Sequence, residues 1–223
     1  MCNMIKTAIF DYNGTLYKDD DINDYCWKET IFEIDRNFKD FDNFFKKYKS
    51  SKNSIIVSAV KQASGLSKLN EEYWINKKEE KYRERCTLLK RSDMADGAEQ
   101  LLNYLKDKNI EIFLCTASIK SNVDFYYKLL NLNRWFSMDK TIYDSGEYEN
   151  KKQMYEACFT KYKLNPKETI VFEDSAPAIE SLVQIGCDNI IEIINQSKSQ
   201  NTKEVKQTIH DFTELDYSLI EIE

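Results

Sequence analysis

Four short groups of polar residues are the parts of this sequence that could carry chemistry. Each follows a run of apolar residues or begins a helical pattern, and together they supply carboxylates, hydroxyls and ammonium groups. In chain order they are Asp11 with Asn13, Thr116 with Ser118, Lys151 or Lys152, and Glu173 with Asp174. Because the carboxyl ends of parallel strands share one edge of a sheet, these groups could converge on one crevice.

Such a set has the composition of a site for phosphoryl chemistry. Carboxylates from two strand ends can hold Mg²⁺, a hard cation that prefers oxygen ligands and usually keeps several waters. Besides binding a metal ion, a carboxylate can act as a nucleophile, and Asp11 itself could attack phosphorus. A lysine and a hydroxyl would then neutralise and orient the phosphoryl oxygens.

Each group by itself also has a purely structural explanation. The first could be an ordinary junction of strand and turn, and the hydroxyls of the second could cap the following helix. The two lysines could be surface charges, and the last pair could be an acidic helix start favoured by the helix dipole. Four such groups in the order that a parallel sheet requires are much harder to explain by chance, so we favour the functional interpretation.

Composition limits the class of protein. A chain of 223 residues that is 42% hydrophobic and 31% charged can bury a sizeable core. The net charge of -6 argues against a general nucleic-acid or anionic-membrane surface. No run of residues is apolar enough for a membrane span, and the first ten residues lack the apolar stretch of a signal peptide. We therefore expect no nucleic-acid or membrane partner.

The cysteine and histidine content narrows the chemistry further. The six cysteines are scattered without a Cys-x-x-Cys pair, which argues against a zinc site. We expect reduced thiols in a cytoplasmic protein, several of them buried. The single histidine, His210, nearly excludes histidine-based triads and histidine-rich metal sites. Hydrolytic chemistry would have to rest on carboxylates, hydroxyls, lysines or an oxygen-ligated metal ion.

Alternating strands and helices must position the polar groups. Apolar runs predict strands over residues 4–10, 110–115, 141–143, 169–172 and 189–194. Helical patterns separate these runs, including a helix that opens at Lys151 and one that Ser175 caps and Gly186 ends. A polar loop with a short strand and helix is expected over 196–223. The alternation predicts a parallel α/β sheet with both faces covered.

A helical segment interrupts this alternation. From residue 22 to about residue 91 the apolar residues recur at helical spacing, and no strand pattern is convincing. We therefore predict an α/β core domain of residues 1–17 and 92–223. An all-helical subdomain of residues 18–91 would be inserted into it, after the first strand.

With these motifs in view, the chain resembles the haloacid dehalogenase (HAD) superfamily hydrolases that carry a helical cap after the first strand. The resemblance rests on the segments 10–16, 112–118 and 171–175 and on Lys151. It covers nearly the whole chain, although the cap matches in position and class only. It implies a Rossmann-like parallel-sheet core. Similar proteins of this cap type include phosphoglycolate phosphatase-like and β-phosphoglucomutase-like enzymes.

The resemblance implies a role for the residues that would meet the substrate. Asp11 would be the nucleophile, and Thr116 would bind phosphate through its hydroxyl, with Ala117 counted in the same phosphate-binding motif. Lys151 would neutralise the phosphate charge. Its spacing to the proline of the following turn favours Lys151 over Lys152, a choice that could slip by one residue.

The resemblance also implies a Mg²⁺ site, with Asp11 and Asp174 as ligands, Glu173 assisting and the backbone carbonyl of Asn13 completing the set. Asn13 departs from the phosphatases of this superfamily, which carry Asp there as general acid and base. An amide cannot do this work, which is typically worth about 10²–10⁴-fold in rate. We expect a formed metal site with impaired turnover. Asn13 is either native to the protein or an introduced inactivating change, and the sequence leaves both open.

Three functions follow from this pattern. We favour a Mg²⁺-dependent phosphomonoester hydrolase that acts through an aspartyl-phosphate intermediate on a small phosphorylated metabolite, weakened by Asn13. The second is a catalytically silent protein that binds a phosphate ligand or regulates another process. The third is a sugar-phosphate phosphomutase. For all three we expect a monomer or a weak dimer.

Overall fold

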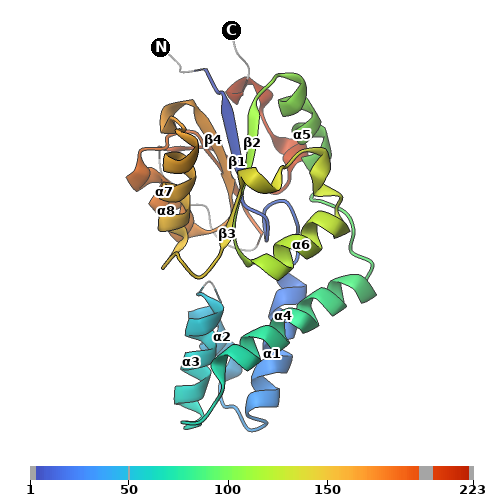
Figure 1. Cartoon of the computed structure of the whole chain (residues 1–223), viewed down its shortest axis with the longest axis vertical. Helices are drawn as coiled ribbons and strands as arrows, with labels where there is room; N and C mark the ends of the chain where they lie inside the picture. Colours follow the sequence, from blue (N-terminus) through green and yellow to red (C-terminus); the bar gives the residue numbers. More distant parts are fainter. Residues whose placement is uncertain (1–3, 50, 196–202, 221–223) are drawn as a thin grey trace. The chain divides into compact units, whose positions relative to one another are not determined.

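A computed structural model of the chain describes residues 4–49, 51–195 and 203–220. The chain divides into two compact units. Met1–Lys18 together with Asp93–Glu223 form the core unit, and Asp19–Ser92 form the helical unit. Figure 1 colours the first residues of the core unit and the start of the helical unit blue, and the last strand of the core unit red.

In the described residues, six parallel strands form the sheet of the core unit, in the order β3-β2-β1-β4-β5-β6. They are β1 (Thr7–Phe10), β2 (Glu111–Ile119), β3 (Thr141–Asp144), β4 (Thr169–Glu173), β5 (Ile190–Ile193) and β6 (Val205–Ile209). β1 lies between β2 and β4, and Phe10 pairs with Leu114 on one side and Phe172 on the other. This confirms the predicted parallel α/β fold and brings the ends of β1 and β4 to neighbouring positions.

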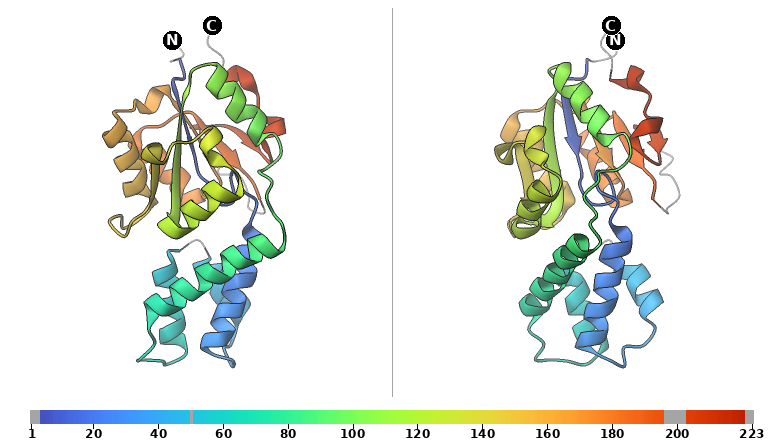
Figure 2. Two further views of the ribbon diagram at one scale, coloured as in Figure 1. Left: turned by 45° about the vertical axis from the view of Figure 1, so that its right-hand side comes forward. Right: turned by 90° about the vertical axis from the view of Figure 1, so that its right-hand side faces the viewer.

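Helices cover both faces of this sheet (Figure 2). In the core unit they are α5 (Ala98–Asp107), α6 (Lys120–Leu129), α7 (Lys151–Tyr162) and α8 (Ala176–Ile185). Short 3₁₀ turns lie at Leu132–Arg134, Met138–Lys140, Pro166–Glu168, Phe212–Glu214 and Tyr217–Leu219. The helices predicted to open at Lys151 and to end at Gly186 are confirmed.

Successive side chains of the central strands point to opposite faces of the sheet, as the two-residue repeat of a strand requires. Ile9 and Val171 pack in one cluster with apolar residues of α7 and α8. The next residues, Phe10 and Phe172, stack with their ring centroids 4.4 Å apart, and both rings contact Phe212 on the opposite face. The central strands are therefore buried on both sides and fix the positions where β1 and β4 end.

Three predictions differ clearly from the structure, whereas the strands predicted over 141–143, 169–172 and 189–194 agree with it to within one residue at each end. The first strand begins at Thr7, three residues later than predicted. Met4 is exposed, and the backbone N–H of Lys6 donates to the carbonyl of Glu168, the last residue of a 3₁₀ turn. β2 runs on to Ile119 instead of ending at residue 115, and its register with β3 shifts on the way. The predicted final helix is replaced by two 3₁₀ turns, and residues 196–202 of the predicted loop lie outside the described residues.

The helical unit consists of α1 (Asp20–Ile34), α2 (Phe41–Tyr48), α3 (Asn53–Ala63) and α4 (Glu71–Leu88) in the part of the chain that the structure describes. Its aromatic residues form a core of their own, in which Trp27, Phe38 and Phe45 pack with aliphatic residues of α3. A buried ion pair of Lys78 and Glu79, 3.0 Å apart, is the main polar feature of this interior.

The start of α5 depends on a glycine. Gly97 has a φ of +78°, and a Cβ atom there would lie 2.6 Å from the backbone nitrogen of Thr213 and 2.7 Å from the carbonyl carbon of Phe212. Gly146 has a similar φ of +85°, but a Cβ atom there would meet no other part of the described chain within 4 Å. The two glycines have a similar φ and differ in how closely other parts of the described chain pack against them.

We expect Gly97→Ala to lower the free energy of unfolding by about 2 kcal/mol or more, since backbone strain adds to a clash with backbone atoms that cannot rotate away. Gly146→Ala should lower the free energy of unfolding by about 1 kcal/mol, since it adds the backbone strain without the clash. Urea denaturation of both variants measures the difference. Equal losses in the two variants would contradict the close packing of Phe212–Glu214 against the start of α5.

Candidate active site

A lysine that bridges two carboxylates forms the centre of the site. Asp11 follows β1, Glu173 is the last residue of β4, and Lys151 is the first residue of α7. The Nζ atom of Lys151 lies 2.6 Å from Oδ1 of Asp11 and 2.7 Å from Oε2 of Glu173. Both carboxylates are buried. Two neighbouring strands thus each end in a buried acid, and one cation from a helix start contacts both.

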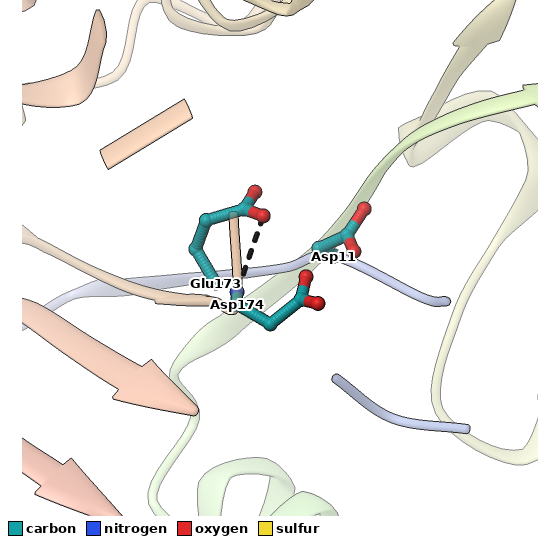
Figure 3. A group of neighbouring side chains, drawn as sticks. All are labelled: Asp11, Glu173 and Asp174. Atoms are coloured by element: carbon teal, nitrogen blue, oxygen red, sulfur yellow. Dashed lines mark hydrogen bonds between the residues drawn. The ribbon is translucent and has the colours of Figure 1, made fainter. Parts of the chain in front are cut away.

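A third carboxylate completes an acidic cluster. Asp11, Glu173 and Asp174 each offer a carboxylate oxygen, and these oxygens lie within 4.8 Å of one another. Figure 3 shows the three side chains, with the carboxyl group of Glu173 turned toward the backbone of Asp174. The dashed line marks the hydrogen bond that the backbone N–H of Asp174 donates to Glu173, at 3.2 Å.

Glu173 is held by four donors, which satisfy a carboxylate that has no exposed surface. Its Oε2 accepts from the Tyr155 hydroxyl at 2.5 Å as well as from Lys151. Its Oε1 accepts from the backbone N–H groups of Asp174, at 3.2 Å, and Ser175, at 3.0 Å. A buried charge needs such partners. These contacts engage both oxygens of Glu173 and tie it to Lys151, while Asp11 and Asp174 could also offer an oxygen to a metal ion.

Burial and charge act against each other in this cluster. Burial raises the pKa of Asp11 to about 7, although the ammonium group of Lys151 opposes the rise. Burial also disfavours the charged form of Lys151, but Asp11 and Glu173 outweigh it and raise the pKa of the lysine above its ordinary value. Three carboxylates around one ammonium group leave an excess of negative charge. The donor set and this excess fit a hard divalent cation.

The turn after Asp11 packs directly against Asp174. Gly14 has a φ of +79°, and a Cβ atom there would lie 2.2 Å from Oδ2 of Asp174. Asn195, which follows β5, donates to the Gly14 carbonyl at 2.9 Å and to Oδ2 of Asp174 at 3.4 Å. Lys18 donates to the same carbonyl at 3.2 Å and to the side chain of Asn195. A glycine at this position leaves room for the Asp174 carboxylate, and these contacts hold the turn against the acidic cluster.

The side chain of Asn13 belongs to a ring of three polar groups. Its Oδ1 accepts from the Ser118 hydroxyl at 2.7 Å, and its Nδ2 donates to the Tyr126 hydroxyl at 3.1 Å. The two hydroxyls lie 3.1 Å apart. The ring of Tyr126 also stacks on Tyr12, with centroids 3.8 Å apart. An amide both donates and accepts, so each member of this ring can donate one hydrogen bond and accept one.

The other predicted residues lie in different surroundings. Thr116 is buried in β2, and its hydroxyl accepts from the backbone N–H of Ser118 at 3.2 Å, which connects it to the ring around Asn13. Ala117 is exposed on the same strand. Lys152 points elsewhere, with its ammonium 2.8 Å from Gln184. Of the two lysines, only Lys151 contacts the described acidic cluster.

Sequence reasoning missed four residues that shape the site. Tyr155 could have been found, because it follows Lys151 by four residues on one helix and so shares its face. Asn195 directly follows a predicted strand, as Asp11 does. The rule that sites lie at the carboxyl ends of parallel strands would therefore have included Asn195. Tyr126 and Lys18 give no local signal, since their roles depend on contacts with distant parts of the chain.

Comparison with known proteins identifies the family. The profile of the haloacid dehalogenase-like hydrolases matches residues 5–186. The chain belongs to this family of hydrolases, and the resemblance found in its motifs is confirmed.

The similar proteins include one named as a probable phosphatase and one named as a HAD hydrolase. A probable pseudouridine-5'-phosphatase of Saccharomyces cerevisiae is 27% identical over 202 residues, spanning 82% of this chain and 80% of the yeast protein. The crystal structure of a family IA, variant 3 HAD hydrolase from Entamoeba histolytica matches with a TM-score of 0.83 and 27% identity, covering 97% and 98% of the two chains. β-Phosphoglucomutase from Clostridium difficile matches with a TM-score of 0.75 and 18% identity over 97% and 96%, a likeness of fold alone.

Two further expectations concern the rest of the chain. Cys26, Cys86, Cys115, Cys158 and Cys187 are buried free thiols, and Cys2 lies outside the described residues. Within the described ranges, no helix combines the length and the apolar character needed to cross a membrane.

The two adjacent lysines provide a matched test of this geometry. We expect Lys151→Met to lower the free energy of unfolding in EDTA by about 3 kcal/mol, since it leaves two buried carboxylates without their cation. Lys152→Met should stay within about 0.5 kcal/mol of the parent, as surface substitutions usually do. Urea denaturation measures both. Equal midpoints for the two variants would show that Lys151 does not balance the acidic cluster.

Proposed function

We propose that the protein is a Mg²⁺-dependent phosphomonoester hydrolase that forms an aspartyl phosphate on Asp11 and acts on a small phosphorylated metabolite. The observation that carries this proposal is the contact of Lys151 with both Asp11 and Glu173, next to Asp174. Membership of a hydrolase family and likeness to a probable phosphatase support it.

Asp11, Asp174 and the backbone carbonyl of Asn13 would hold the metal ion, with Glu173 assisting through the bonds that fix Asp174. Bound Mg²⁺ would neutralise phosphoryl oxygens and orient them for in-line attack. Gly14 allows the turn that carries Asn13 to reach Asp174, because any side chain there would collide with the Asp174 carboxylate. The fit therefore depends on a glycine as well as on the acids.

The chain's own residues would divide the reaction between them. An oxygen of Asp11 attacks phosphorus, and the bond from phosphorus to the ester oxygen breaks. Lys151 neutralises the phosphoryl charge while it keeps the nucleophile close, and Thr116 orients a phosphoryl oxygen through its hydroxyl. Water then attacks phosphorus and releases Asp11. The helical unit is proposed as the cap that excludes bulk water and selects the substrate.

One observation favours a second function. Both polar atoms of the Asn13 side chain are hydrogen-bonded, so an amide is accommodated at this position. This favours Asn13 as a native residue over an introduced inactivating change. A catalytically silent protein that binds a phosphate ligand would need the same cluster without an acid or base. The phosphomutase alternative rests only on a likeness of fold. A cytoplasmic monomer or weak dimer stays our expectation for any of these functions.

Substitution at the two reacting positions tests the phosphatase. We expect phosphate release from p-nitrophenyl phosphate in Mg²⁺, its loss in EDTA and its loss in Asp11→Asn. Asn13→Asp should raise the rate by about 10²-fold or more, because it supplies the missing acid and base. A phosphate-release assay of the three proteins, with and without EDTA, measures this. Silence of both the parent and Asn13→Asp would favour the binding protein instead.

The leaving group provides an independent test. Asn13 cannot protonate a departing alkoxide, so kcat/KM should rise with the acidity of the leaving group, from sugar phosphates through p-nitrophenyl phosphate to acetyl phosphate. Pseudouridine 5'-phosphate belongs in the series because of the yeast relative's name. In Asn13→Asp the dependence should flatten. A parent protein with equal kcat/KM across the series would contradict the missing acid.

A further inference from the structure

The two halves of the proposed reaction place different demands on the site. Attack by Asp11 on an acyl phosphate forms an Asp11–phosphorus bond and breaks the bond from phosphorus to the acyl oxygen. The carboxylate that departs is a stable anion and takes no proton. Attack by water on the aspartyl phosphate breaks the bond from phosphorus to Asp11, and inorganic phosphate leaves with the protons of the water. This step is fast only when a base takes a proton from the water as it attacks. The first half needs no base, and the second half is slow without one.

The described groups around Asp11 offer no base for that proton. Lys151 is an ammonium ion paired with Asp11 and Glu173. Glu173 already accepts from four donors, and Tyr155 is one of them. In the proposed function Asp174 is a metal ligand. The acidic cluster is therefore suited to accept a phosphoryl group, and its carboxylates are committed to other partners.

Asn13 and its ring of polar groups occupy the position where phosphatases of this family carry the acid and base. An amide has no basic lone pair, and both polar atoms of this one are engaged by Ser118 and Tyr126. The hydroxyls of Ser118 and Tyr126 also contact each other, at 3.1 Å. Three neutral groups that satisfy one another are a stable arrangement, and none of them takes a proton from water at neutral pH.

We propose that the protein is a phosphoryl acceptor that keeps the group on Asp11 when an acyl phosphate is the donor. The phosphorylated protein is then its main form while donor is present, and slow hydrolysis returns it to the free carboxylate. This rests on the proposed function in two respects, that Asp11 is the nucleophile and that Asp174 binds the metal ion. The result is a two-state protein whose charge at the carboxyl edge of the sheet reports the supply of an activated phosphodonor.

Intact-protein mass spectrometry tests this on the full chain. The protein is incubated with acetyl phosphate and Mg²⁺, quenched in acid at several times, and then freed of donor to follow decay. We expect the addition of one phosphoryl group, stable in acid and removed by hydroxylamine, as an acyl phosphate must be. Asp11→Asn should gain none. Asn13→Asp should lose the group at least about 100-fold faster, because it supplies the base.

A matched control distinguishes the effect of a base at residue 13 from the effect of an added negative charge. Asn165→Asp makes the same substitution at an exposed turn, where the side chain only accepts from the backbone of Lys167. It should hold the phosphoryl group as long as the parent does. Equal acceleration in Asn165→Asp and Asn13→Asp would overturn the assignment to residue 13.

Phosphate release measured in the same samples separates two kinds of failure. Steady release from acetyl phosphate, with no phosphorylated protein at any time, would overturn this inference and leave the phosphatase standing. Neither release nor phosphorylation, in the parent and in Asn13→Asp alike, would overturn both.

Discussion

The ammonium group of Lys151 contacts two buried carboxylates that end neighbouring strands, and the rest of the site depends on this contact. Asp11 and Glu173 arrive at these positions because β1 and β4 pair in register at the centre of the sheet. Without the lysine, two buried charges would face each other with no cation between them, which is strongly destabilising. The four donors on Glu173 hold the lysine in place. The fold thus positions Asp11, the nucleophile that we propose.

A second constraint acts on the turn between β1 and the helical unit. Gly14 lets this turn approach Asp174, and Asn195 bonds to both sides of the contact. Asn13, one residue earlier, lies in a closed ring with Ser118 and Tyr126. One tight turn therefore carries both the contact with Asp174 and the ring around Asn13. In the function that we propose, these would be the metal-binding and the proton-transfer positions, and an amide occupies the second.

The sequence predicted what depends on local pattern and sheet topology. Asp11 and Glu173 stand at the ends of buried runs, and parallel strands carry such ends to one edge, while Lys151 begins a predicted helix. It could not predict the ring around Asn13, because Tyr126 reaches it only through the packing of α6. The true start of β1 and the extension of β2 through Thr116 were also missed, since pairing partners far along the chain decide them. Apolar runs mark strands but do not mark where pairing stops.

A crystal structure with Mg²⁺ and beryllofluoride, a mimic of a phosphoryl group on a carboxylate, tests the central claim most directly. Our account predicts beryllium on an oxygen of Asp11, its fluorides next to Lys151, and Mg²⁺ between Asp11 and Asp174. Beryllofluoride on any other side chain, or an acidic cluster that takes up Mg²⁺ while Asp11 stays unmodified at saturating beryllofluoride, would contradict it.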